Sequence, residues 1–194
     1  MSLILENICK HVSLTEEEKV LFLSKTETIK VKAKTMLLNA GEVSKYSYFV
    51  NEGILRSFTI NDNIVEHILS FACSDWWIGD MYSLISKKPG HLFIEVIEDA
   101  DLVLLSRENQ EELFHSIPKL ERFFRILIEN SLVAHQDRLM ENLSLTAEER
   151  FEKFCQKYPS LIASIPQKYI ASYIGVTPEF FSKMKSKMLR NNSN

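Results

Sequence analysis

Residues 167–184 read QKYIASYIGVTPEFFSKM, and the spacing of these residues predicts the structure of the C-terminal part of the chain. Ala171 is a small residue where two short helices would cross, and Gly175, four positions later, suits a turn that requires a positive φ angle. Thr177 can cap a second helix, and Pro178 is favoured at a first helical position. The spacing therefore predicts a helix-turn-helix made of helices over 166–174 and 178–190.

The second helix of such a pair enters the major groove of DNA by its N-terminal end. Its lysines and arginine suit phosphates, while Glu179 can accept from cytosine N4 or simply stabilise the first turn through the helix dipole. No arginine, the commonest guanine reader, lies in that first turn. An ordinary helical hairpin with a solvated basic face is the alternative. The candidate DNA-contacting residues are Lys168, Thr177, Glu179, Phe180, Ser182, Lys183, Lys185, Lys187 and Arg190.

Charge is distributed unevenly along the 194 residues, whose formal net charge is −3. From Ile165 onward there are five basic residues and one acidic residue, which is a net charge of +4. The first 164 residues carry 18 basic and 25 acidic side chains, which is a net charge of −7. This asymmetry favours nucleic-acid binding by the C-terminal segment, although the chain as a whole is not basic.

Residues 27–106 have the composition of a β-domain, with short runs rich in Val, Ile, Phe, Tyr and Thr between turn residues. Asn51-Glu52-Gly53 and Glu98-Asp99 are among the expected turns. Many short strands at near-regular spacing, with no helix between them, predict an antiparallel jelly roll. The predicted strands are 28–32, 35–38, 46–51, 54–60, 65–71, 92–97 and 102–106.

A long helix is predicted next, because Pro118 begins a stretch without Gly or Pro that reaches about Leu143. Its apolar residues recur at spacings of four and seven on one face, but those of its first half reach round most of the circumference. We expect one face to lie on the β-domain and another on a second copy of the chain. Burial of the helix within one monomer is the alternative. The predicted interface residues are Phe124, Ile128, Leu132 and Leu139.

These elements predict an α+β fold: an N-terminal double-stranded β-helix (jelly roll), a long dimerisation helix and a C-terminal helix-turn-helix. Catalysis is not expected, because the five histidines form no His-x-His pair and the chain has no phosphate loop or His-Glu-x-x-His helix. Three scattered cysteines without CxxC spacing favour a cytoplasmic setting and predict no metal site. No stretch approaches the roughly 18 uninterrupted apolar residues of a membrane span.

This layout resembles that of the Crp/Fnr family over residues 14–189. The resemblance implies a homodimeric transcription regulator that binds double-stranded DNA and senses a small-molecule effector in its β-domain, with RNA polymerase as a candidate further partner. It implies a cyclic-nucleotide-binding-like domain over 1–117, a dimerisation helix over 118–143 and a DNA-binding domain over 144–194. The carrying segments are Asn39–Glu42, Tyr48–Gly53, Trp76–Leu84 and Ile170–Gly175.

The family's cyclic-nucleotide site uses a Gly-Glu pair and, about ten residues later, an Arg-Ser or Arg-Thr pair whose Arg neutralises the phosphate. Here the first pair reads Gly79-Asp80, the second reads Gly90-His91 or His91-Leu92, and no Arg lies between Gly79 and Arg107. A lysine does not replace the bidentate guanidinium, so we expect no cyclic AMP binding of the usual kind and no other cofactor. The candidate effector pocket is Trp77, Gly79, Asp80, Met81, Tyr82, Ser83, His91 and Leu92.

Two further departures from the family are visible. Cys9 alone cannot hold the iron–sulfur centre that the redox branch of the family builds on an N-terminal cysteine cluster. The family usually adds a β-hairpin wing after the reading helix, whereas only residues 191–194 follow it here. A ligand-sensing or protein-interaction module with a degenerate helix-turn-helix is therefore the alternative to a DNA-binding regulator.

Overall fold

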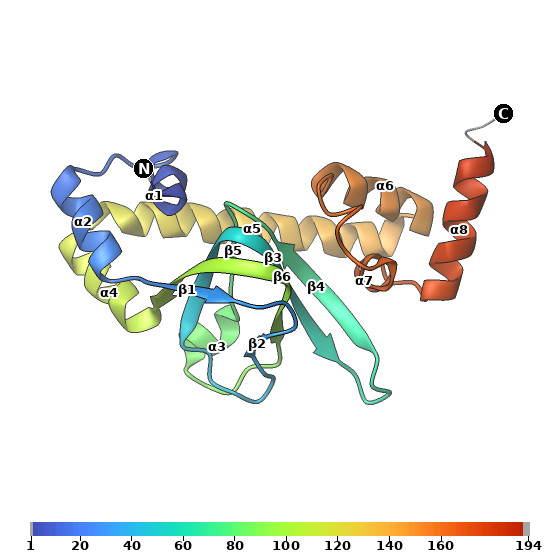
Figure 1. The fold of residues 1–194 in the computed structure, drawn as a ribbon, viewed down its shortest axis with the longest axis horizontal. Helices are drawn as coiled ribbons and strands as arrows, with labels where there is room; N and C mark the ends of the chain where they lie inside the picture. The colour runs from blue at the N-terminus through green and yellow to red at the C-terminus, as the bar shows by residue number, and fades with distance from the viewer. Residues whose placement is uncertain (1, 192–194) are drawn as a thin grey trace. The chain divides into compact units, whose positions relative to one another are not determined.

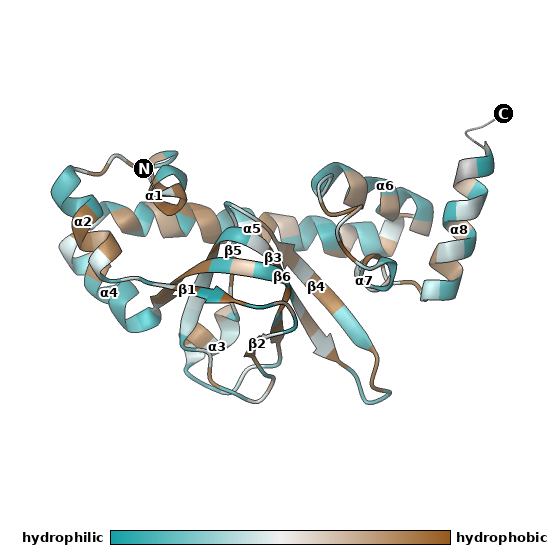
Figure 2. Ribbon diagram, in the orientation of Figure 1, coloured by the Kyte–Doolittle hydropathy of each residue, from teal (hydrophilic) through white to brown (hydrophobic). Residues whose placement is uncertain are grey.

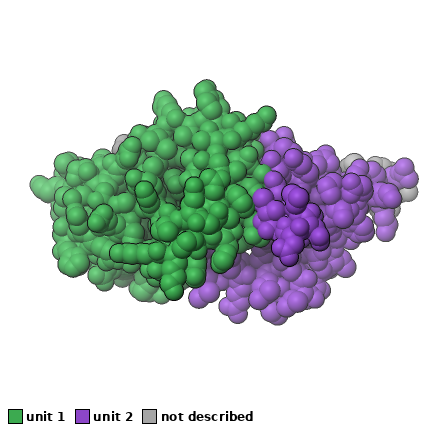
Figure 3. Space-filling model, turned by 90° about the horizontal axis from the view of Figure 1, so that it is seen from below, with its two compact units in different colours: residues 1–59, 69–130 green, residues 60–68, 131–194 purple. Residues whose placement is uncertain are grey.

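The computed structural model describes residues 2–191, apart from the side chains of residues 189 and 191, so most of the segment expected in place of a wing lies outside it. The chain forms two compact units (Figure 3): unit 1 is residues 1–59 and 69–130, and unit 2 is residues 60–68 and 131–194. Figure 1 shows the elements, which are α1 (Leu3–Cys9), α2 (Glu16–Ser24), β1 (Glu27–Val31), β2 (Met36–Leu38), β3 (Tyr46–Ile60), β4 (Glu66–Ala72), β5 (Trp77–Ile78), α3 (Met81–Ser86), β6 (Phe93–Ser106), α4 (Arg107–Ser116), α5 (Lys119–Ser144), α6 (Ala147–Lys157), α7 (Gln167–Tyr173) and α8 (Pro178–Asn191).

Two long strands, β3 and β6, organise the sheet. They pair antiparallel, β1 and β2 pair with β6, and β4 and β5 pair with β3. The turns expected at 51–53 and 98–99 are wrong, because both segments lie inside these strands, at shifts of register. Gly53 has a φ of +97°, and a Cβ there would lie 2.6 Å from the carbonyl oxygen of Asp99. The two strands therefore bend together at a bulge that only glycine fits.

Strand alternation builds two cores in unit 1. Tyr48 and Val50 join one core within the sheet, whereas Phe49, which points the other way, joins a core shared with helices. That second core takes Leu113 from α4 and Phe123 from α5, so the first part of α5 is fixed to the β-domain. The expected domain boundaries at 117 and 143 stay predictions, because α5 contributes residues to both units.

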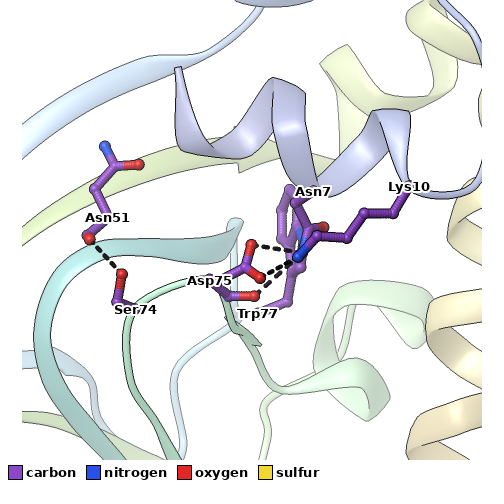
Figure 4. Close-up of polar contacts among 6 residues, drawn as sticks. All are labelled: Asn7, Lys10, Asn51, Ser74, Asp75 and Trp77. Atoms are coloured by element: carbon purple, nitrogen blue, oxygen red, sulfur yellow. Dashed lines mark hydrogen bonds and ion pairs between the residues drawn. The ribbon is translucent and has the colours of Figure 1, made fainter. Parts of the chain in front are cut away.

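Two helices of unit 1, α1 and α3, are absent from the sequence prediction. Figure 4 shows how α1 is fixed to the turn between β4 and β5. The Asn7 amide donates to Asp75 Oδ1 at 2.9 Å, Lys10 forms an ion pair with the other carboxylate oxygen, and Trp77 Nε1 donates to Asn7 Oδ1 at 3.3 Å. Asp75 has a φ of +74°, a conformation that Asp tolerates better than most residues. These contacts make α1 an integral part of unit 1.

Unit 2 contains the helix-turn-helix that the sequence predicts. Thr146 and Glu149 form a capping box at the start of α6, and Gly175 adopts a φ of +74° between α7 and α8. Ala171 is fully buried, which lets α7 and α8 approach closely. The buried side chains of this unit are Phe154, Tyr158, Leu161, Ile165, Ile170, Ala171, Tyr173, Ile174, Phe181 and Met184. No helix among the described residues is long and apolar enough to cross a membrane.

The loop between β3 and β4 and the first residues of β4 also belong to unit 2, where two side chains bond the start of β4. Ser172 Oγ donates to the Glu66 carbonyl oxygen and accepts from the Ile68 amide. Arg138 Nη2 donates to the carbonyl oxygens of Ile68 and Tyr173, and its guanidinium lies 4.0 Å from the centre of the Tyr173 ring. Burial lowers the pKa of Arg138, and these acceptors compensate the desolvation of its charge. We call this set of contacts the hairpin clasp.

Candidate functional site

One face of α8 carries the exposed polar residues of the helix-turn-helix. Glu179, Lys183, Ser186 and Arg190 follow one another at spacings of three and four, and are therefore on one side of the helix. All are exposed, as are Ser182 and Lys187 beside them. Within the described part of the chain, Lys183, Lys187 and Arg190 make no ion pair, so their charges face solvent. The surface suits a polyanion.

Two of the predicted DNA-contacting lysines differ from the others. Lys185 is half-buried on another side of α8, where its Nζ lies 5.7 Å from the centre of the Phe181 ring. Lys168 lies in the first turn of α7, with Nζ 5.0 Å from the centre of the Tyr169 ring. The structure therefore does not bring Lys185 together with the α8 face, and a cation–π contact holds each of these two ammonium groups.

Thr177 has a structural function at the start of α8. Its Oγ1 accepts a hydrogen bond from the Phe180 amide at 3.2 Å, as expected of a capping residue. Arg150 is also engaged in structure, because Nε donates to the Ile174 carbonyl oxygen and Nη1 to that of Leu145. The arginine therefore links α6 to the turn of the helix-turn-helix rather than adding to the exposed basic face.

The segment 79–92 closes on itself through hydrogen bonds. Asp80 Oδ1 caps α3 by accepting from the Ser83 amide at 3.1 Å. Ser83 Oγ accepts from the Ser44 amide at 2.8 Å and donates to the Lys88 carbonyl oxygen at 2.7 Å. Gly90 exchanges backbone hydrogen bonds with the turn at 41–42. The Ser83 hydroxyl and the Gly90 backbone are therefore already engaged.

A buried carboxylate occupies the centre of this segment. Asp80 is 2% exposed, and its Oδ2 has no hydrogen-bond partner among the residues described. A Cβ added to Gly90 would lie 2.1 Å from that oxygen, so the carboxylate fills the space beside the Gly90 Cα. The two lysines of the segment, Lys87 and Lys88, are exposed. An acid, rather than a cation, is thus the buried charged group of this segment.

The other predicted pocket residues are dispersed. Trp77 lies in the core against α1 and α5, with its ring 5.6 Å from that of Phe124, so its proposed place in the pocket is wrong. Trp77 and Ile78 are successive strand residues and therefore face opposite sides of the sheet. Met81 and Tyr82 are exposed, and the Tyr82 ring stacks on that of His91 at 5.7 Å. Gly79 and Leu92 are half-buried.

Two polar contacts of the β-domain, Ser57 with Ser70 and Arg56 with Glu95, are missing from the sequence prediction. Ser57 and Ser70 share a hydrogen bond of 2.7 Å between β3 and β4, and Ser57 is on the same side of its strand as the buried Leu55. Ser57 could have been identified from the sequence, because it is a polar residue at an inward-facing position of an otherwise apolar strand. Arg56 points to the opposite side of the strand, where Nε of its buried guanidinium donates to Glu95 Oε2 at 2.6 Å.

An exposed apolar face runs along α5, and Figure 2 shows apolar residues recurring along this helix. Ile128, Leu132 and Leu139 are 51%, 66% and 60% exposed. The prediction for Phe124 is wrong, because this residue is 7% exposed and its ring packs against Phe123 and Trp77. Phe124 is part of the unit 1 core, and the exposed apolar residues Ile128, Leu132 and Leu139 lie on a different face of α5. Val133, Met140 and Leu143 are also exposed on α5.

Comparison with known proteins agrees with this geometry. Residues 28–116 match the family model of the cyclic nucleotide-binding domain. The chain is 22% identical over 165 residues to an anaerobic regulatory protein of Aggregatibacter actinomycetemcomitans, covering 79% of this chain and 63% of that protein. The chain spans just under two thirds of the length of the curated relatives it matches first.

Solved structures share the fold. The c-di-GMP responsive global regulator CLP of Xanthomonas campestris aligns with a TM-score of 0.74 and 14% identity, covering 92% of this chain and 93% of that one. FixK2 from Bradyrhizobium japonicum aligns with a TM-score of 0.75 and 20% identity, covering 86% of each chain. The class is thus a protein with a cyclic-nucleotide-binding-type β-domain and a C-terminal helix-turn-helix. These similarities confirm the predicted resemblance to the Crp/Fnr family and the predicted fold class.

Proposed function

We propose that this protein is a cytoplasmic transcription regulator that binds double-stranded DNA as a homodimer and acts by binding rather than by catalysis. The observation that carries the proposal is the exposed basic face of α8 at the second position of a helix-turn-helix. The second helix of this motif lies in the major groove, where exposed lysines and arginines neutralise phosphates. Arg150 and Arg138 contribute instead to the packing of this unit.

The DNA-binding function is tested by selecting genomic fragments with the purified full-length chain and measuring affinity across a salt titration. We expect the chain to prefer some fragments over others. The logarithm of the binding constant should fall linearly with the logarithm of the salt concentration, with a slope of about −0.9 for each phosphate neutralised. A Lys183→Ala, Lys187→Ala, Arg190→Ala triple variant should lose most of this affinity. A triple variant at exposed Lys30, Lys45 and Lys88 is the control, because it removes the same charge from unit 1. No preferred fragment, with identical binding by both variants, would contradict the function.

Dimerisation is proposed from the apolar face of α5. Ile128, Leu132 and Leu139 recur at helical spacing and are more than half exposed, whereas side chains on the core side of the helix, such as Phe123, are buried. A helix that is apolar on two sides buries the second side against another surface, and a two-fold axis brings identical helices together. The dimer would present the basic face of α8 twice, as paired half-sites in DNA require.

We propose that any effector of the β-domain differs from cyclic AMP, because the residues of segment 79–92 do not fit a cyclic phosphate. The buried charged group there is the Asp80 carboxylate, whose unpartnered Oδ2 would repel a phosphate. The Ser83 hydroxyl already donates to Lys88, and the buried Arg56 is engaged with Glu95. Calorimetry with cyclic AMP and cyclic GMP should show no binding at micromolar concentration, and micromolar binding of either would overturn the proposal.

A further inference from the structure

The first turns of α8 offer a small set of chemical groups to a base edge. The Thr177 hydroxyl is engaged in capping, because it accepts from the Phe180 amide. Besides the ring of Pro178, the exposed groups that remain are the carboxylate of Glu179, the phenyl ring of Phe180, the hydroxyl of Ser182 and the ammonium of Lys183. The phenyl ring differs from the others in having neither a hydrogen-bond donor nor an acceptor.

Packing within unit 2 does not account for this ring. Phe180 is 49% exposed, although the next residue, Phe181, is buried and stacks edge-on against Phe151 with centroids 5.1 Å apart. The Phe180 ring makes no ring or cation–π contact with any residue that the structure describes. It lies on the side of α8 that also carries Lys183, three positions later, and Lys187, seven positions later. The apolar surface of Phe180 therefore belongs to the exposed basic face.

The major groove contains one prominent apolar feature on its base edges, the C5-methyl group of thymine. We propose that Phe180 contacts a thymine C5-methyl group and so sets the requirement for thymine at one position of the recognised sequence. The inference rests on the DNA-binding function proposed above and names a feature of its ligand. Lys183 and Lys187, on the same side of the helix, would hold the neighbouring phosphates while the ring lies against the methyl group.

The test replaces single thymines by uracil, which pairs identically but has no methyl group. A preferred sequence is first obtained by selecting duplexes with the full-length wild-type chain, and each thymine in it is then replaced in turn. We expect one replacement per half-site to weaken wild-type binding by about fourfold, the value of one buried methyl group. A Phe180→Ala variant should bind the thymine and uracil duplexes equally, whereas a Phe180→Leu variant, which keeps an apolar side chain, should retain part of the preference.

The outcomes separate the inference from the function on which it rests. A selected sequence whose affinity is insensitive to every uracil replacement would overturn the role of Phe180 alone, and so would a uracil effect that persists in Phe180→Ala. Failure of the wild-type chain to select any sequence would overturn both the inference and the DNA-binding function. An Ile162→Ala variant is the control, because it truncates another exposed apolar side chain of unit 2 and should leave the uracil effect unchanged.

Discussion

Ser172 Oγ, on α7, accepts a hydrogen bond from the amide of Ile68, on β4, at 3.1 Å. The same hydroxyl donates to the Glu66 carbonyl oxygen at 2.7 Å, so it bonds β4 as a neighbouring strand would. Arg138 Nη2 completes the clasp by donating to the Ile68 carbonyl oxygen at 2.7 Å. The end of the β3–β4 hairpin is thus an integral part of the unit that contains the helix-turn-helix.

A Ser172→Ala variant should loosen this clasp. The change leaves an amide and a carbonyl oxygen without their partner, which costs about 1–3 kcal/mol when such groups are buried. We expect faster hydrogen exchange at the Ile68 amide and a lower free energy of unfolding. Ser164→Ala is the control, because Ser164 Oγ donates to Ser160 within its own turn. Unchanged protection of Ile68 in Ser172→Ala would show that the clasp does not hold the strand.

A Leu132→Asp variant should abolish dimerisation through α5. Leu132 is 66% exposed in the single chain, so the charge is tolerated in the monomer, whereas in a dimer it would desolvate at an apolar interface. Light scattering should show that the molecular mass falls by half. Val20→Asp, on α2, changes a side chain of similar exposure and should leave the mass unchanged. Equal masses for wild-type protein and Leu132→Asp would remove this face of α5 as the interface.

A Gly90→Ala variant should destabilise unit 1, because the new Cβ would lie 2.1 Å from Asp80 Oδ2. Overpacking of this kind typically costs about 1–3 kcal/mol. In an Asp80→Ser background the same change should cost less, since serine is shorter and still caps a helix. Denaturant unfolding of the four proteins of this cycle measures the difference. Equal costs in the two backgrounds would show that the Asp80 carboxylate does not occupy the space beside Gly90.

Lys187→Ala and Lys185→Ala should affect DNA binding differently, although the two residues are neighbours on α8. Lys187 is exposed on the basic face, and its removal should reduce the magnitude of the salt slope by about 1. Lys185 is half-buried against Phe181, so its removal should leave the slope nearly unchanged. Salt titrations on one duplex measure both. A larger slope change for Lys185→Ala would contradict the assignment of the α8 face.

The helical part of the fold was the most predictable from the sequence, because its signals are local. The capping residue Thr177 and the turn glycine Gly175 lie where the sequence indicates. The β-domain was predicted as a jelly roll, but its turns at 51–53 and 98–99 were wrong. Asn, Asp and Gly mark a bulge as well as a turn, and only the pairing of β3 with β6 distinguishes the two.

The candidate sites were only partly predictable, because exposure depends on tertiary packing. Periodicity grouped Phe124 with Leu132, yet packing against Trp77 places the first in a core and leaves the second exposed. The lysines of α8 differ in the same way. Lys185 is half-buried over the Phe181 ring, whereas Lys183 and Lys187 are exposed. The hairpin clasp could not be predicted, because Ser172 and Ile68 are far apart in the sequence and nothing in the motif that contains Ser172 indicates a contact with β4.

The contact between Asp80 and Gly90 also limits how this chain can evolve. Position 90 is one of the two that the resemblance aligns with the family's phosphate-binding arginine, and any side chain there begins with a Cβ that collides with the Asp80 carboxylate. An arginine gained at position 90 would therefore be harmful until residue 80 had changed. No single substitution at position 90 can therefore supply an arginine there without a compensating change at residue 80.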